Sequence, residues 1–440
     1  MFRKKHSLIK GTLILTSAGL VSRVLGFFFR IFLSHTFGEE QVGLYQLIFP
    51  FYALCLSLST SGLETAISRS VSRFHSLGRT QDGKLIFQTG LILSVLISLI
   101  CTFLVQKNSV FLSNRFLGDP RCATLLYLIV LALPAASVHS CICGYHYGLQ
   151  RTSVPAISQL LEQFVRISSV FVLYFIFIHS GVHPEIPLAV SGIIFGELAA
   201  AGYSLFSLKK KGFDADSPYI LSISKSCSEL LRLSVPLTVN RTAITFLQGI
   251  EAASIPVCLE LASHSASEAL SIYGVLTGMA LPCILFPCAL TNSVSLLLIP
   301  AVAQKQAESS SKETFLLIKK AAGGCFSLGL LCSVFFLLTG SFLGNFLFHS
   351  TLAGNFIVTL AWICPFLYLG VTLSSILHGL GYPGITFVLN LIACGIRILF
   401  VLFALPVYGI RGYLCGLLIS QAVMALLSIG ILLRQTHFNA

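Results

Sequence analysis

Charged residues are scarce in this sequence. Only 10% of its 440 residues are Asp, Glu, Lys or Arg, whereas 55% are hydrophobic and the mean hydropathy is +0.89. A soluble globular domain carries about 25% charged residues, and a chain with far fewer cannot present a hydrated surface to water. The composition therefore excludes a cytosolic enzyme, a nucleic-acid-binding domain and a disordered protein.

Motifs for enzymatic or metal chemistry are also missing. The chain has no H-E-x-x-H, no P-loop, no G-x-S-x-G and no C-x-x-C. Its 14 cysteines are scattered through apolar stretches, with Cys141 and Cys143 as the one close pair, which predicts small buried side chains and no zinc site or disulfide framework. We expect no catalytic residue, no metal and no cofactor. The lack of a large soluble segment excludes a pump with its own nucleotide-binding domain.

Long apolar stretches dominate what is present. A spanning helix needs about 20 mostly apolar residues. Twelve spans are predicted, at 11–34, 42–68, 85–105, 122–146, 154–178, 187–208, 233–255, 271–303, 321–344, 354–378, 384–404 and 412–433. The first is expected to be a retained helix and not a cleaved signal, because it contains Arg23 and Arg30 and has no small-x-small cleavage site. The sequence thus predicts an all-α, polytopic membrane protein.

Lys and Arg are distributed unevenly over the loops between these spans. With the N-terminus inside, nineteen of the 28 lie in cytoplasmic segments, four lie outside and five lie within spans. Because cytoplasmic loops are enriched in Lys and Arg, both termini are predicted in the cytoplasm, for a multi-pass protein of the cytoplasmic membrane. The same bias accounts for most of the net charge of +12 without a nucleic-acid partner.

The chain also divides into two halves. A basic, polar stretch at 209–232 is predicted as a cytoplasmic linker between an N-terminal six-helix lobe, 1–208, and a C-terminal six-helix lobe, 233–440. A shift of 231 positions places Tyr147–Ile167 on His378–Ile398 with matching Gly, Leu and Arg, and a shift of 232 matches the second span to the eighth. Six spans per half give both halves the same direction in the membrane. This predicts pseudo-symmetric lobes around a central cavity.

Nine charged residues lie within the predicted spans. An Arg at mid-membrane costs about 2.5–3.5 kcal/mol on insertion scales, so such residues usually face a protein interior or a wet cavity and mark a pathway. They are Arg23, Arg30, Arg166, Arg241, Arg397, Glu64, Glu162, Glu197 and Glu251.

Arg23 and Arg30 are predicted to line the cavity. They are seven positions apart, close to two helical turns, so they share a face at about 10 Å along the axis. Gly26 lies between them and permits close approach. Two guanidinium groups on one face suit a diphosphate, because Arg binds phosphate oxygens in a bidentate fork. The alternative is that these side chains snorkel to the membrane interface.

Arg166 and Arg397 are aligned by the repeat but differ in their surroundings. Glu162 and Arg166 are spaced i, i+4, which favours a structural ion pair on one helix. Ala393 stands at the position matching Glu162, so Arg397 has no such partner on its own helix. It can reach another helix or the cavity.

The remaining in-span charges are Arg241 and three carboxylates. Arg241 is a candidate cavity cation, and Glu251 is turned from it by about 80°, so the two need not pair. Glu251 and Glu197 are candidate coupling or cavity carboxylates. Glu64 lies near the cytoplasmic end of its span, which favours simple solvation.

Prolines predict bends in several spans. Pro50, Pro282 and Pro287 each remove a backbone hydrogen bond, and with Gly26 they are candidate gate or kink positions. The eighth span is expected to be a bent gate helix, although static membrane helices also contain proline.

Several motifs resemble those of a known family. Leu8–Thr16, Ser22–Phe27, Tyr45–Pro50 and Tyr273–Pro282 are similar to stretches of the stage V sporulation protein B-like flippases, in the polysaccharide branch of the multidrug/oligosaccharidyl-lipid/polysaccharide (MOP) exporter superfamily. The similarity runs over about residues 8–430. It implies a MATE-like, two-lobe fold of twelve to fourteen helices, and export of undecaprenyl-diphosphate-linked sugar such as the peptidoglycan precursor for the spore cortex.

The resemblance also bears on single residues and partners. It implies that Arg23, and with it Arg30, lines the cavity. Glu64 departs from the family pattern, where proline is usual, and the two further helices by which larger relatives accommodate the lipid tail have no counterpart here. Membrane lipids and peptidoglycan-synthesis proteins are the implied partners.

A flippase for a lipid-linked saccharide, working by alternating access, is the leading hypothesis. Arg23, Arg30, Arg241 and Arg397 would offset the desolvation of its diphosphate. A drug or organic-cation antiporter is the alternative within the same fold; it predicts a cavity dominated by acids and aromatics, against which five arginines and four glutamates in spans argue. A membrane-bound glycosyl- or acyltransferase would need a catalytic loop that the short outer loops do not supply. A non-transporting scaffold is a third alternative.

Overall fold

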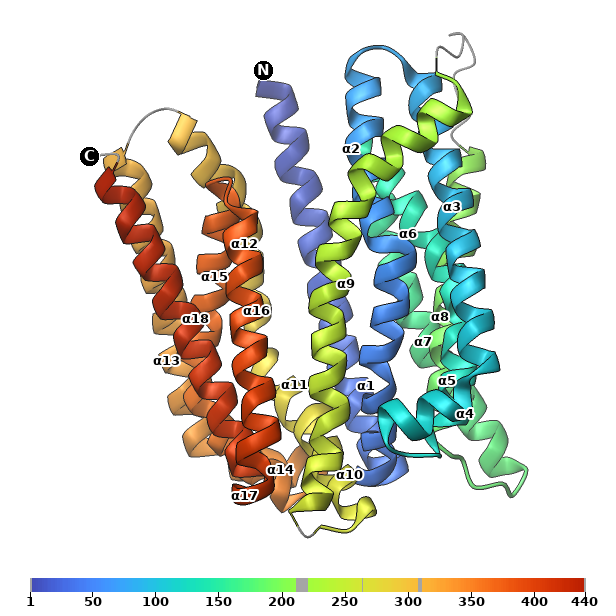
Figure 1. Cartoon of the computed structure of the whole chain (residues 1–440), viewed down its shortest axis with the longest axis vertical. Helices are drawn as coiled ribbons and strands as arrows, with labels where there is room; N and C mark the ends of the chain where they lie inside the picture. Colours follow the sequence, from blue (N-terminus) through green and yellow to red (C-terminus); the bar gives the residue numbers. More distant parts are fainter. Residues whose placement is uncertain (1, 211–220, 263, 308–310, 439–440) are drawn as a thin grey trace. The chain divides into compact units, whose positions relative to one another are not determined.

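The protein is all-helical in its computed structural model (Figure 1). The structure describes residues 2–210, 221–262, 264–307 and 311–438, and no strand occurs in these ranges. Eleven of the described helical runs are long and apolar enough to cross a bilayer. Within lipid a helix satisfies its own backbone hydrogen bonds, so apolar runs of this length fold in this way. The chain is a polytopic all-α membrane protein, as predicted.

The first of these runs, Leu13–Ser76, contains two predicted spans. Its elements are α1 (Phe2–Leu56), the π-helical turn η1 (Ser57–Ser61) and α2 (Gly62–Ser76). Gly38 has φ 77° and ψ 173° and divides α1 into two helices. Residues with a side chain rarely adopt positive φ, so glycine fits the point where the first predicted span ends and the second begins.

Contacts divide the chain into two compact units, Met1–Phe29 with Leu47–Gly249, and Arg30–Gln46 with Ile250–Ala440. Besides its parts of α1, η1 and α2, the first unit contains α3 (Thr80–Lys107), α4 (Ser109–Leu112), η2 (Ser113–Leu117), α5 (Cys122–Ile129), η3 (Val130–Ala132), α6 (Leu133–Gly148), α7 (Ser153–His179), α8 (Pro187–Lys210) and most of α9 (Ile223–Leu261). The second contains α10 (Ala266–Gly274), η4 (Val275–Ala280), α11 (Leu281–Leu285), α12 (Cys288–Ala307), α13 (Ser311–Phe348), α14 (Thr351–Leu360), η5 (Ala361–Ile363), α15 (Cys364–Gly379), α16 (Pro383–Leu399), η6 (Phe400–Ala404), α17 (Leu405–Tyr408) and α18 (Ile410–Phe438).

The two units repeat one another at an offset of 231 residues. Both ends of α6 and α15 differ by 231, as do both ends of the 3-10 turns η3 and η5 that precede them. A Cβ on Gly148 would lie 2.7 Å from the backbone oxygen of Ser68. A Cβ on Gly379 would lie 2.8 Å from that of Ile299. Each of these pairs is related by the same offset, so the repeat extends from the sequence to the helix packing inside each unit.

The predicted linker, 209–232, is helical over its last part. Residues 211–220 lie outside the described residues, but α9 begins at Ile223. Leu230 is fully buried in a core with side chains of α2, α3 and α6, and Glu229 pairs with Arg73 at 2.7 Å. The backbone NH of Leu221 also donates to Asp82 at 2.9 Å. The start of α9 is therefore packed against the first unit, and the boundary between the units falls within α9, between Gly249 and Ile250.

The predicted eighth span is interrupted rather than continuous. It comprises α10, the π-helical turn η4 and α11, which ends before Phe286 and Pro287, and α12 then begins at Cys288. Pro282 is the second residue of α11, and neither proline can donate a backbone hydrogen bond. Pro50 lies inside α1 and is half-buried. The helix is interrupted near both prolines, and its bending and its action as a gate stay predictions.

Candidate functional site

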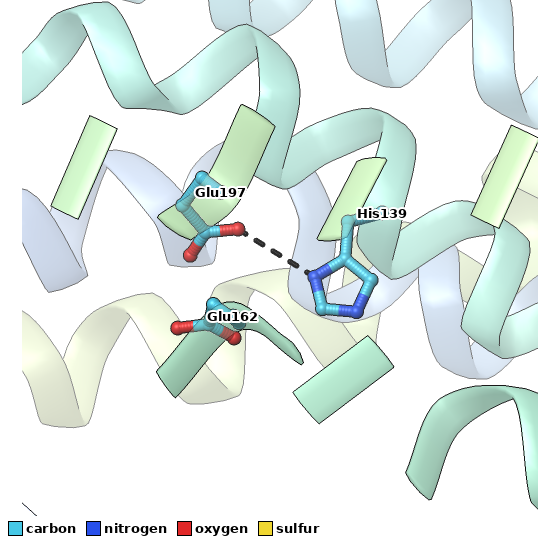
Figure 2. Close-up of side chains that lie close together, drawn as sticks. All are labelled: His139, Glu162 and Glu197. Carbon is cyan, nitrogen blue, oxygen red and sulfur yellow. Dashed lines mark ion pairs between the residues drawn. The ribbon is translucent and has the colours of Figure 1, made fainter. Parts of the chain in front are cut away.

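Three ionisable side chains meet inside the first unit. His139 of α6, Glu162 of α7 and Glu197 of α8 each present a ligand atom within 4.8 Å of the others. Figure 2 shows the imidazole of His139 and the carboxylate of Glu197 pointing toward one another, with Glu162 beside them. These residues are called the first-unit cluster below.

Glycines on α8 bring the two carboxylates together. A Cβ on Gly196 would lie 2.8 Å from the backbone oxygen of Glu162, and a Cβ on Gly192 would lie 2.9 Å from that of Arg166. One turn of helix separates the two glycines, so they form a smooth strip on which α7 rests directly. Glu197, next to Gly196, is thereby held at the contact line with Glu162.

His139 links the cluster to a buried serine. Its Nδ1 lies 3.5 Å from Oε2 of Glu197, and its Nε2 lies 3.0 Å from Oγ of Ser158. The Ser158 hydroxyl donates to the backbone oxygen of Pro155 at 3.0 Å. A hydroxyl has a single proton to donate, so Ser158 accepts from Nε2 of His139 when its own proton lies on Pro155. In that arrangement the ring nitrogen that faces Ser158 carries a hydrogen.

Glu162 is engaged by Arg166 on the same helix. The two form a hydrogen-bonded ion pair, with 18% and 20% of their side chains exposed. The structure thus contains the i, i+4 pair that the sequence indicates, while its structural role stays a prediction. With Glu162 paired to Arg166, the side chain that faces the Glu197 carboxylate is His139.

Two buried oxygens at the cluster lack hydrogen-bond partners among the described residues. They are Oε2 of Glu197 and the hydroxyl oxygen of Tyr52. The exposed fractions of these two residues are 8% and 7%. Tyr52 lies within electrostatic range of Glu197, Glu162 and Arg166. A buried polar atom without a partner costs about 1–3 kcal/mol, so these atoms indicate a ligand or proton that completes the site.

Glu64 and Arg241 lie near each other in the same unit. Glu64, on α2, is half-buried and within electrostatic range of both Arg241 and His139. A Cβ on Gly144 would lie 2.6 Å from the backbone oxygen of Glu64, so α6 approaches α2 closely there. The Arg241 side chain, on α9, is exposed.

The second unit contains a different charged pair. Nε of Arg397, on α16, donates to Oε1 of Glu251, on α9, at 2.8 Å, with 15% and 8% of their side chains exposed. The hydroxyl of Tyr413, on α18, donates to the same oxygen at 3.0 Å. Cys394 Sγ lies 3.8 Å from the other oxygen. Arg397 thus reaches another helix, and a predicted cavity cation and a predicted cavity carboxylate neutralise each other.

Arg23 and Arg30 lie on the first part of α1. Arg23 is exposed and Arg30 is half-buried near Tyr45. Within the described ranges neither forms an ion pair or a side-chain hydrogen bond. Gly26 lies against α7, where a Cβ would be 3.3 Å from Nε2 of Gln163. The cavity roles of these residues stay predictions.

Sequence reasoning missed His139, Tyr52 and Tyr413. A single histidine or tyrosine in an apolar stretch carries no motif. The repeat, however, offers a signal: at the 231-residue offset shared by α6 and α15, His139 corresponds to Gly370. A charge present in one copy of a repeat and absent from the other marks a residue that the shared fold does not require.

Solved structures share this fold. An inward-facing MATE family multidrug transporter of the MOP superfamily superposes with a TM-score of 0.69 at 16% identity, covering 96% of this chain and 95% of that one. A MOP superfamily transporter from Pyrococcus furiosus, described by the reverse polarity of its binding pocket, gives 0.68 at 14% identity, with coverage of 98% and 96%. The chain therefore has the same fold as these solved structures.

Sequence comparison identifies the family within that fold. The family described as polysaccharide biosynthesis protein matches residues 8–304, and the chain belongs to it. Stage V sporulation protein B of Bacillus subtilis is 29% identical over 96% of this chain and 83% of its own length. The lipid II flippase MurJ of the same organism is 25% identical over 68% of this chain and 58% of its own.

Proposed function

We propose that the protein is a flippase that moves an undecaprenyl-diphosphate-linked saccharide across the cytoplasmic membrane. The observation that carries the proposal is the pair Arg23 and Arg30, two helical turns apart on an apolar helix and without acidic partners among the described residues. A carboxylate partner would neutralise such charges, as Glu251 does for Arg397. Unneutralised guanidinium groups at membrane depth suit an anionic substrate, and the diphosphate supplies that charge.

Membership in the polysaccharide biosynthesis family and similarity to a lipid II flippase support the same substrate class. Similarity to a sporulation protein supports the finer proposal that the saccharide is a peptidoglycan precursor for the spore cortex. In this proposal both termini face the cytoplasm, the polyprenyl tail stays in lipid, and peptidoglycan-synthesis proteins use the product. The protein catalyses no covalent step.

The proposed mechanism is alternating access, with Arg23 as the main diphosphate ligand. Each hydrogen bond from a charged donor contributes about 1.5–3 kcal/mol, which offsets the cost of removing phosphate oxygens from water. Arg30 and the exposed Arg241 add positive charge along the same route. Export moves negative charge out of a negative interior, which is favourable by about 2.3 kcal/mol per charge per 100 mV.

A reconstituted flipping assay with a fluorescent lipid-linked disaccharide tests the proposal. Arg23→Ala should abolish flipping while the protein still inserts and folds. Arg23→Lys should restore only part of the rate, because Lys keeps the charge but loses the planar fork that grips two oxygens. Arg30→Ala should have a smaller effect. If the Arg23→Ala variant flips the substrate at the parental rate, Arg23 does not bind the substrate. If Arg23→Lys flips as fast as wild type, snorkelling of Arg23 to the membrane interface is favoured.

A drug or organic-cation antiporter is the second candidate, favoured by the carboxylates of the first-unit cluster and by the multidrug transporters that share the fold. It predicts that liposomes containing the protein accumulate a fluorescent organic cation and do not flip the lipid-linked sugar. The same preparation therefore distinguishes the two candidates.

A further inference from the structure

We propose that His139 and Glu197 bind one proton between them, and that this proton is the coupling ion of the transporter. Proton binding follows from the geometry of the first unit alone. The coupling role rests on the flippase activity proposed above.

The contacts of His139 accommodate one added proton. When the Ser158 hydroxyl donates to the backbone oxygen of Pro155, it accepts from Nε2 of His139, which then carries a hydrogen. A neutral imidazole would then present the lone pair of Nδ1 to Oε2 of Glu197 at 3.5 Å. Two acceptors face each other there, and one added proton, on Nδ1 or on the carboxylate, turns this repulsion into a hydrogen bond.

Counting the charges in the cluster also gives one proton. The two carboxylates of the cluster carry two negative charges, and Arg166 neutralises one through Glu162. One positive charge is missing, and a single proton supplies it. A divalent ion would overcompensate beside the Arg166 guanidinium, and Na⁺, a hard cation, prefers oxygen ligands to an imidazole nitrogen.

Burial makes the binding of this proton depend on the charged groups nearby. Glu197 is buried, so its charge is poorly solvated, and the partnerless Tyr52 hydroxyl lies nearby. The titratable and charged groups near His139 and Glu197 from the neighbouring helices are Tyr52 of α1, Glu64 of α2, Cys143 of α6, Glu162 and Arg166 of α7, and Arg241 of α9. Cys143 Sγ lies 3.7 Å from the Ser158 hydroxyl.

The internal repeat argues that His139 and Glu162 are not needed for folding. The positions 231 residues after them are occupied by Gly370 and Ala393. The mate of Ser158 is Leu389, which belongs to the apolar core of the second unit. The same helical framework therefore forms without any of these polar groups. A burial cost that only one copy of the repeat bears indicates a function of that copy.

Infrared difference spectroscopy of the whole protein in lipid nanodiscs tests proton binding without any transport. Spectra taken at acidic and alkaline pH should contain a carboxyl C=O band or imidazole ring bands from the site. Glu197→Gln should remove these bands, and His139→Gln should remove or shift them. The triple variant Glu251→Leu, Arg397→Met, Tyr413→Phe is the control, because it removes an equally buried carboxylate together with the two side chains that hold it; it should leave the bands in place. Identical difference spectra for wild type and Glu197→Gln would overturn the proton site.

Flipping in proteoliposomes under imposed gradients tests coupling. With one proton per cycle, each unit of pH difference should shift the steady-state distribution of the fluorescent lipid-linked disaccharide by about tenfold. Glu197→Gln should make that distribution independent of the gradient. A wild-type distribution that ignores the pH gradient, or follows a Na⁺ gradient instead, would overturn proton coupling. Absence of flipping in every condition, with the infrared bands intact, would refute the flippase proposal and leave the proton site standing.

Discussion

Breaking the Glu251–Arg397 pair from one side should strongly destabilise the second unit. Both side chains are largely buried, and Oε1 of Glu251 accepts from the guanidinium at 2.8 Å and from Tyr413 at 3.0 Å. Glu251→Gln keeps the shape and an acceptor oxygen but removes the charge. Arg397 is then left as a buried, uncompensated cation, and truncating one side of such a pair costs about 3–5 kcal/mol.

Removing the whole network should cost much less. Replacing a buried ion pair by apolar residues of similar volume is often neutral or even stabilising by about 1–4 kcal/mol. The Tyr413 hydroxyl would then lack its acceptor, at about 1–3 kcal/mol, so it must be removed as well. We therefore expect the triple variant Glu251→Leu, Arg397→Met, Tyr413→Phe to unfold closer to wild type than Glu251→Gln does.

Thermal unfolding of the detergent-purified protein, followed by the loss of the monodisperse peak, measures this order. The expected ranking of midpoints is wild type, then the triple variant, then Glu251→Gln and Arg397→Met. A Glu251→Gln protein that unfolds with wild type would refute the argument, because it would mean that Arg397 is solvated without its carboxylate. If Glu251→Gln keeps the wild-type stability but no longer flips the substrate, the Glu251–Arg397 pair acts in transport and not in stabilising the fold.

Three further outcomes are expected. Reporter fusions at 69–84 should report the cytoplasm and fusions at 256–270 the outside, and a reversed signal from either means that the span count is wrong. Glu162→Gln should lower abundance or thermal stability with nearly intact flipping per folded molecule, and normal abundance with lost flipping contradicts a structural role. Gly148→Ala and Gly379→Ala should each destabilise by about 1–3 kcal/mol, because each added methyl meets a backbone oxygen of a neighbouring helix; a marked difference between their melting temperatures would show that the repeated contact is not equivalent.

The features predicted correctly from the sequence are mostly local ones. A spanning helix needs only its own apolar length, so most predicted spans coincide with helical runs. The Glu162–Arg166 contact needs only the i, i+4 spacing. The repeat is visible in two short sequence blocks, at offsets of 231 and 232, and the offset of 231 recurs in the boundaries of α6 and α15 and of η3 and η5.

Features that depend on tertiary packing were not predictable in the same way. Arg397 and Glu251 are 146 positions apart, and their helices are brought together by the fold of the second unit. Residues 223–232 are polar enough to resemble a linker. They are nevertheless helical, because Leu230 is buried against α2, α3 and α6. His139 joins Glu197 only because Gly192 and Gly196 let α8 contact α7 directly.

Comparison of the two units separates the scaffold from the chemistry. Where the units agree, as in the paired glycine contacts, the residues are small or apolar and explain how each unit packs. Where they disagree, the residues are charged, and each unit handles the charge differently. The second unit closes Glu251 with a permanent cation from Arg397, which leaves nothing to exchange. The first unit leaves Glu197 facing the imidazole of His139, the pair that we propose to gain and lose a proton. A transporter needs one part that holds its form and one that changes charge during its cycle, and in this proposal the two units divide these parts between them.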